Sequence, residues 1–308
     1  MRNRLRIFFA VFFCFVIYLN LSAQSEIVAE FPIKIERNKT MIPVTIGNTG
    51  PLKLILDSGM ASDGILLFDI EKVETSAFDR LTEYDIQGAG GGSGSKTLVA
   101  DSASFYINKT KFEDQQVIIL TSNTFKGFPT DGVIGYSILG HYTVKIDYDT
   151  EIMTLYKPGM YPPDNSWEEL PIYFKDNMIP WTDAQVVIKN EEPITLSMYI
   201  DYASGEAIEL LVRDNNKFTM PDETEDVFLG RGLSGDVHGK RGFISKIILG
   251  KYELQNVKAS FAPAEIRSKQ KNADGVLGNN TFRRFNVVFD YADKKMFIKP
   301  NKYFELPF

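Results

Sequence analysis

An acidic residue at the end of an apolar run is the first candidate for chemistry. Asp57 follows the stretch 52–56, begins the triplet Asp57-Ser58-Gly59, and is followed by a second apolar run that ends at Leu67. A carboxylate beside such strands is costly unless it is hydrogen-bonded or functional. Gly59 lets backbone N–H groups approach the carboxylate, and Ser58 can hydrogen-bond away from it and fix the loop. On its own, the triplet is also typical of a turn capped by Asp.

An internal repeat supplies a second aspartate. The segment 131–153, DGVIGYSILGHYTVKIDYDTEIM, aligns without a gap on 274–296, DGVLGNNTFRRFNVVFDYADKKM, at an offset of 143. At an offset of 144, Asp57 falls on Asp201 and Leu66-Leu67 falls on Leu210-Leu211. Motifs that recur in one order at nearly one spacing indicate a tandem duplication. We therefore predict two lobes, 26–160 and 165–308, joined by the Pro-rich link 158–164.

Two lobes that each carry one Asp on a loop predict a site between them. Two carboxylates held close together cannot both ionise readily, so the pair shares a proton. One can then take a proton from water while the other donates to a carbonyl oxygen, which is what amide hydrolysis requires. We expect Asp57 and Asp201 to be catalytic without a metal or another cofactor. A His/Cys metal site has little to be built from, because the chain holds only His141, His238 and Cys14.

Each lobe also carries an apolar-apolar-Gly motif. Gly135 ends the first, Val133-Ile134-Gly135, and Gly278 ends the second, Val276-Leu277-Gly278. Such a motif is typical of a tight turn that feeds a buried strand. Beside an Asp loop, the same strand can pass beneath the carboxylate and exclude water, and we expect both motifs to support the loops in this way.

Two glycine-rich clusters are open to three interpretations: a phosphate cradle, a flexible linker or a mobile hairpin. The second cluster matches G-x-G-x-x-G, but no helix follows to hold a dinucleotide phosphate. Each cluster lies about 30 residues after its Asp, which favours hairpins that bind an extended peptide through strand-like hydrogen bonds. The clusters comprise Gly88, Gly90, Gly91, Gly92 and Gly94 in the first lobe, and Gly230, Gly232 and Gly235 in the second.

The elements that position these motifs are mainly strands. Short alternating or apolar runs are separated by Gly, Asn, Asp and Pro, and helical periodicity is scarce. Expected helices or helical turns are 68–78, 136–141 and 279–284. Expected strands are 33–35, 42–46, 52–56, 104–107, 116–120, 143–146 and 152–156.

The N-terminus predicts export. Arg2, Arg4 and Arg6 precede the apolar stretch 7–19, and small residues end at Ala23, so residues 1–23 are predicted to be a signal peptide. An uncleaved anchor is the alternative, although the stretch is shorter than the roughly 18 residues of a membrane span. Without the leader, 31 basic residues face 40 acidic ones, a net charge of −9. This charge argues against nucleic acid or an anionic membrane as a partner.

Together these motifs resemble the bacterial retropepsin-like aspartyl proteases, which are two-lobed relatives of pepsin. The resemblance covers essentially the whole mature chain and rests on LILDSG at 54–59, the glycines from Gly88, and DGVIG at 131 with DGVLG at 274. It implies a mainly β, two-lobed pepsin/retropepsin-like acid protease fold, an Asp57/Asp201 dyad, a loop-locking Ser58 and flap-like glycine-rich hairpins. The second triplet, Asp201-Tyr202-Ala203, departs from the family's Asp-Thr/Ser-Gly, and we expect it to hold Asp201 less precisely.

Three hypotheses remain open from the sequence. The first is an exported, monomeric aspartic endopeptidase, periplasmic or secreted, that hydrolyses an extended peptide or protein. The second is a non-catalytic peptide-binding protein on the same fold with a degenerate second site. The third is a dyad formed by Asp57 from each of two chains.

Overall fold

The computed structural model describes residues 27–308, apart from 61, 162, 176, 190 and 271. The predicted signal peptide, 1–23, therefore lies outside the described residues. The fold is mainly β, as the sequence predicts, and its strands form three sheets in the described part of the chain. No helix in that part is both long and apolar enough to cross a membrane.

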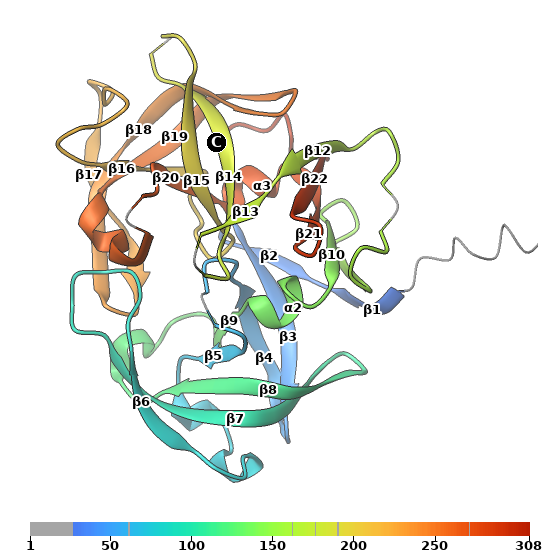
Figure 1. Ribbon diagram of the computed structural model, residues 1–308. Coiled ribbons are helices and arrows are strands. Elements are labelled where there is room, and N and C mark those ends of the chain that lie inside the picture. The colour runs from blue at the N-terminus through green and yellow to red at the C-terminus, as the bar shows by residue number, and fades with distance from the viewer. Residues whose placement is uncertain (1–26, 61, 162, 176, 190, 271) are drawn as a thin grey trace, which may run out of the picture.

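Two eight-stranded sheets form the two lobes, which lie one below the other in Figure 1. In sheet order, the first consists of β2 (Lys34–Glu36), β3 (Lys39–Ile46), β4 (Thr49–Leu56), β9 (Gly132–Ile134), β5 (Ile65–Leu67), β8 (Thr110–Leu120), β7 (Ser95–Ile107) and β6 (Thr82–Ile86). The second consists of β13 (Tyr173–Phe174), β14 (Pro180–Val187), β15 (Ile194–Asp201), β20 (Gly275–Gly278), β16 (Ile208–Val212), β19 (Tyr252–Pro263), β18 (Gly235–Leu249) and β17 (Glu225–Gly232).

The same three-strand arrangement recurs in both lobes and reflects the repeat. In the first, β9 runs parallel to β4 and antiparallel to β5. In the second, β20 runs parallel to β15 and antiparallel to β16. Leu66 lies opposite Val133, and Glu209 lies opposite Val276. Glu209 therefore occupies the position in the second lobe that Leu66 occupies in the first. The sequence alignment of Leu66 with Leu210 is wrong by one residue, because the connection after Asp201 is one residue shorter.

A third sheet of six strands draws on both halves of the chain and stands at the right of Figure 1. Its central pair joins β10 to β21, with Val144 opposite Phe289 and Ile146 opposite Val287, and all four side chains are buried. The lobes therefore share a core. The sheet order is β1 (Ile27–Pro32), β11 (Ile152–Tyr156), β10 (Thr143–Asp147), β21 (Phe285–Asp290), β22 (Lys295–Pro300) and β12 (Glu168–Pro171).

Helices are short throughout the described chain: α2 (Tyr136–Leu139), α3 (Asn279–Phe282) and the 3₁₀ turns η1 (Ile70–Lys72), η2 (Thr75–Ala77), η3 (Asn123–Phe125) and η4 (Ala264–Gln270). The first two lie in the predicted turns 136–141 and 279–284. The prediction of a helix over 68–78 is wrong, because the segment forms only η1 and η2, separated by extended residues. Its buried side chains, Phe68, Val73 and Phe78, recur every five residues, and that spacing does not follow one face of an α-helix.

Candidate active site

The Asp57 loop is held by the strand beneath it. Asp57 follows β4, and its N–H donates to the Ile134 carbonyl 2.8 Å away. The Gly59 N–H donates to Asp57 Oδ1 at 2.8 Å, which fixes the orientation of the carboxylate. Gly135 lies directly below, where a Cβ would stand 2.1 Å from the Asp57 carbonyl oxygen. Only glycine allows so close an approach at this position.

The Asp201 loop repeats this construction with different residues. Asp201 ends β15 and lies beside Gly278 of β20, where a Cβ would stand 2.2 Å from the Glu206 carbonyl oxygen. The Ala203 and Ser204 N–H groups donate to Asp201 Oδ1 at 2.9 and 3.1 Å. The methyl group of Ala203 does not prevent this bond, and among the described residues the second carboxylate accepts two backbone hydrogen bonds where the first accepts one.

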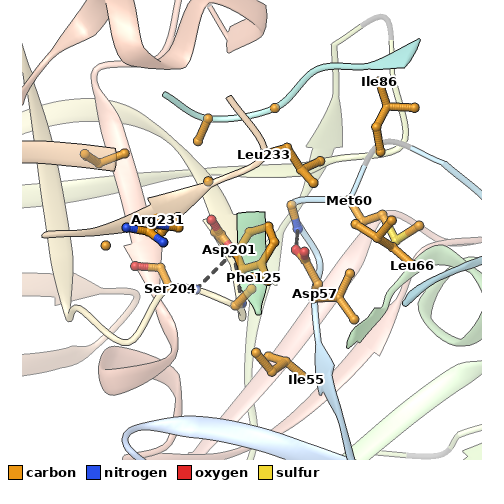
Figure 2. Close-up of a pocket in the computed structure, with 18 of the residues that line it drawn as sticks. Ile55, Asp57, Met60, Leu66, Ile86, Phe125, Asp201, Ser204, Arg231 and Leu233 are labelled. Atoms are coloured by element: carbon orange, nitrogen blue, oxygen red, sulfur yellow. Dashed lines mark hydrogen bonds between the residues drawn. The ribbon is translucent and has the colours of Figure 1, made fainter. Parts of the chain in front are cut away.

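The two carboxylates face the same point. A Cβ placed on Gly59 would stand 3.2 Å from Oδ1 of Asp57 and 3.2 Å from Oδ1 of Asp201. Figure 2 shows the two side chains side by side, with Leu233 above them in this view. Burial, and then repulsion from Asp201, raise the pKa of Asp57 to about 7, against the opposing effects of the Gly59 N–H, Lys39 and Arg267. In this arrangement Asp57 holds a proton under acidic conditions.

Ser58 locks the two loops together from one side. Its hydroxyl donates to the Ile200 carbonyl at 2.7 Å and accepts from the Tyr202 N–H at 3.0 Å, so it spans the two lobes. Tyr202 does not return the contact. Its fully buried ring packs on Phe282 and Phe289, with ring centroids 5.3 and 5.4 Å away, and therefore belongs to the shared core.

The return contact comes from a hairpin turn of the first lobe. Arg37 and Asn38, both with positive φ, connect β2 to β3 and place Lys39 against the second loop. Lys39 Nζ donates to the Ala203 carbonyl, and Asn38 Nδ2 donates to the Gly205 carbonyl at 3.3 Å. This β2–β3 turn is itself held by α3, because Asn279 Nδ2 donates to the Asn38 carbonyl at 2.9 Å.

Lys39 also brings a positive charge to the two aspartates. Desolvation by burial lowers its pKa, and attraction to Asp201, Asp57 and Glu206 opposes that effect. Glu206 is itself paired with Arg241 at 2.5 Å. The charge of the amine therefore acts on both members of the carboxylate pair.

The two glycine-rich clusters meet above the carboxylates. Gly88–Gly94 connects β6 to β7, and Gly230–Gly235 covers the end of β17, the turn at 233–234 and the start of β18. The Gly92 N–H donates to the Ser234 carbonyl at 2.5 Å, and the Ser234 N–H donates to the Ala89 carbonyl at 2.9 Å.

Close packing at this junction requires several of the glycines. A Cβ would stand 2.6 Å from the Gly235 nitrogen if placed on Gly90, and 2.1 Å from the Ala89 carbonyl oxygen if placed on Gly232. Gly91 and Gly230 face open space. The predicted hairpins are therefore present, and their tips bind each other.

The carboxylates and hairpins enclose a cleft of about 1440 Å³. This volume exceeds that of a typical small-molecule pocket and suits a longer ligand. Its lining includes Asp57, Asp201, Lys39 and both glycine-rich clusters. Among the described residues, no group of three or more His, Cys, Asp or Glu side chains is placed to hold a metal ion.

The architecture can be compared with known proteins. No family model and no curated sequence matches the chain. Among solved structures, the aspartic proteinase from Irpex lacteus is similar, with a TM-score of 0.55 and 11% identity over 90% of this chain and 98% of that chain. The chain has the pepsin-like fold. At this identity the likeness shows the two-lobed β architecture alone.

Sequence reasoning missed three charged residues of this cleft. Lys39 carries no local signal, because its partner, Ala203, is 164 residues away. Glu209 was hidden by the one-residue shift in the repeat alignment, and its partner, Arg267, lies in a turn outside both aligned motifs. A charged residue within the apolar run 208–212 was the only available hint.

Proposed function

We propose that this chain is an aspartic endopeptidase of the bacterial retropepsin-like type, in which Asp57 and Asp201 act together on one water molecule. The observation that supports it best is the facing pair of loop carboxylates, each oriented by backbone N–H groups within a cleft of peptide size. The presence of a glycine-rich hairpin in both lobes supports the retropepsin-like assignment. With the predicted leader 1–23, the proposal is of an exported monomer, periplasmic or secreted.

The geometry suits a two-step hydrolysis. The protonated Asp57 donates to the substrate carbonyl oxygen while Asp201 takes a proton from water, and the water oxygen bonds to the carbonyl carbon. The resulting diol then returns a proton to Asp57, while Asp201 passes its proton to the amide nitrogen and the C–N bond breaks. Every proton lost by one group is gained by another, and the dyad ends as it began.

The substrate is proposed to be an extended peptide. The hairpin tips cover the carboxylates, and their backbone groups are suited to strand-like pairing with a bound chain. Since Asp57 already has a carboxylate partner in its own chain, a second copy is not needed to complete the pair.

Substitution of each aspartate tests the proposal. We expect Asp57→Asn and Asp201→Asn each to lower the cleavage rate of a peptide library by about 10²- to 10⁴-fold, because each removes a proton donor or acceptor. Asp79→Asn, at an exposed carboxylate outside the cleft, is the control. Cleavage that survives Asp201→Asn would contradict the single-chain dyad. Peptide binding without cleavage by the unmodified protein would instead support the non-catalytic alternative.

A further inference from the structure

The two sides of the cleft are built from equivalent positions that carry different chemistry. Val133 lies between Ile55 and Leu66 in the first lobe, and Val276 lies between Tyr199 and Glu209 in the second. Each lobe therefore presents these equivalent strand positions on its own side of the aspartate pair. Because the scissile bond must lie at the pair, a bound peptide places one side chain on each side.

The Asp57 side carries a cluster of apolar residues. Phe68 stacks on Phe125 with ring centroids 4.3 Å apart, and Phe128 meets both rings edge-on. In Figure 2, Met60, Leu66 and Ile86 lie on this side, away from Ser204 and Arg231 on the Asp201 side. The apolar residues that line it are Ile55, Met60, Leu66, Phe68, Ile86, Val99, Ile118, Phe125, Phe128 and Val133.

The Asp201 side contains a buried ion pair. Arg267 Nε lies 3.0 Å from Glu209 Oε1, where the first lobe has Leu66 in place of the glutamate. The Glu209 side chain is 3% exposed and that of Arg267 is 14% exposed, so Arg267 is the more accessible member of the pair, and both residues line the cleft. Burying such a pair costs desolvation that an apolar pair in its place would avoid. A ligand that uses the guanidinium would explain its presence.

Two other charged residues of the second lobe that line the cleft already have ion-pair partners. Glu206 pairs with Arg241, and Arg231 pairs with Asp236 on the outer hairpin. Although burial works against it, attraction to Glu209, Tyr199 and Asp201 raises the pKa of Arg267, which therefore stays charged. Its planar set of N–H donors is suited to carboxylate and carboxamide oxygens.

We propose that the cleft selects an asymmetric dipeptide: a large apolar or aromatic side chain on the Asp57 side, and a side chain ending in a carboxylate or carboxamide, bound by Arg267, on the Asp201 side. The inference rests on the proposed function. An apolar side chain beside Arg267 would desolvate the guanidinium without replacing its hydrogen bonds to water. A lysine there would be repelled by it.

Peptides with a non-hydrolysable bond between Phe and a variable residue test the selection, in both orders. We expect Glu and Gln at the variable position to bind about 10- to 100-fold more tightly than Leu, with Lys weakest, in one of the two orders only. Comparison of Glu with Gln separates recognition of a charge from recognition of an oxygen acceptor. Cleavable versions of the same peptides should show the same ranking in kcat/KM.

A paired substitution converts the second side to the chemistry of the first. Glu209→Leu with Arg267→Met removes both charges together, and we expect it to reverse the preference in favour of Leu. Lys246→Met with Glu253→Leu, an ion pair between β18 and β19 outside the cleft, is the matched control and should leave the ranking unchanged. Circular dichroism and thermal unfolding verify that both double variants fold.

The outcomes separate this inference from the proposed function. Equal binding of all four non-hydrolysable peptides by a protein that still cleaves their cleavable versions would overturn the selection alone. An unchanged ranking in the folded Glu209→Leu/Arg267→Met variant would do the same. Failure of every peptide to bind or be cleaved would overturn both. The expected ranking in binding without cleavage would support the selection and overturn the protease.

Discussion

A lysine beside two carboxylates changes how the pair titrates. Lys39 reaches the Ala203 carbonyl from the first lobe and stabilises the charged form of Asp57. Its equivalent in the second lobe is Ile179, since Met41 and Trp181 occupy matching positions opposite Ile55 and Tyr199. The second lobe therefore does not repeat this cation, and at the residue scale Lys39 is one asymmetry between the two halves of the site.

Removal of that charge should move the pH profile. We expect Lys39→Met to shift both limbs of the kcat/KM profile to higher pH, by about one unit, because the pKa of Asp57 rises when a nearby cation is lost. Lys39→Arg keeps the charge and should leave the limbs near their original positions. Measurement of peptide cleavage from pH 3 to 9, a range that spans the pKa of about 7, checks both variants.

The control separates electrostatics from folding. Lys53→Met removes a half-buried lysine that pairs with Glu36, on the strand that leads to Asp57, and should not move the profile. If Lys39→Met lowers the rate equally at every pH, then Lys39 serves only to hold the Ala203 loop.

Sequence predicts the first half of this site better than the second. Asp57, Ser58 and Gly59 form a local pattern, and their backbone contacts are set within a few residues. Asp201 is found only through the repeat. The contacts of Lys39 depend on how the lobes pack, and nothing in its neighbours along the chain indicates a partner in the other lobe.

At the scale of elements, the two glycine-rich hairpins are bound to each other above the carboxylates. The Gly88 N–H donates to Ser234 Oγ at 3.2 Å, and the Ser95 hydroxyl donates to the Leu233 carbonyl at 3.0 Å. These contacts add to those between Gly92, Ala89 and Ser234. Because the tips are bound to each other, we expect the hairpins to separate when a peptide enters. The positions of both clusters could be predicted from their glycines, but their mutual contact could not, because each cluster is unremarkable as a single hairpin.

A disulfide across the tips should hold the cleft closed. A Cβ on Gly88 would stand 3.0 Å from Cβ of Leu233, close to the ~3.5–4.5 Å that a disulfide requires. We expect the oxidised Gly88→Cys/Leu233→Cys variant to lose cleavage to the level of Asp57→Asn, and to regain it after reduction. The only native cysteine, Cys14, lies in the predicted leader, so competing pairs are few.

The single variants serve as controls for this experiment. Gly88→Cys and Leu233→Cys alone should respond to neither oxidant nor reductant. An oxidised double variant that cleaves at the original rate would show that substrate reaches the carboxylates without separating the tips.

At the scale of the whole molecule, the shared sheet couples the two lobes. Separation of β10 from β21 would expose side chains that are now fully buried, including Val144, Ile146 and Val287. We therefore expect the lobes to unfold in one cooperative transition, which gives a single free energy of unfolding. The sequence repeat predicts two lobes but not this sheet, because the strand pairing joins segments about 140 residues apart whose apolar patterns match many partners.

The protonation of the aspartate pair should then affect the free energy of unfolding of the entire chain. Asp57 has a pKa of about 7 in the folded state and close to the ordinary 3.8 when unfolded. Between these values the folded state keeps a proton that the unfolded state releases, so the free energy of unfolding falls as pH rises from about 4 to 7. Asp57→Asn removes this loss and retains an oxygen to accept from the Gly59 N–H. We expect the variant to exceed the original protein in free energy of unfolding by roughly 2–4 kcal/mol at pH 8, with little difference near pH 4. Urea denaturation at both values measures the change, and an equal difference at pH 4 and pH 8 would show that the buried carboxylate is not the group responsible.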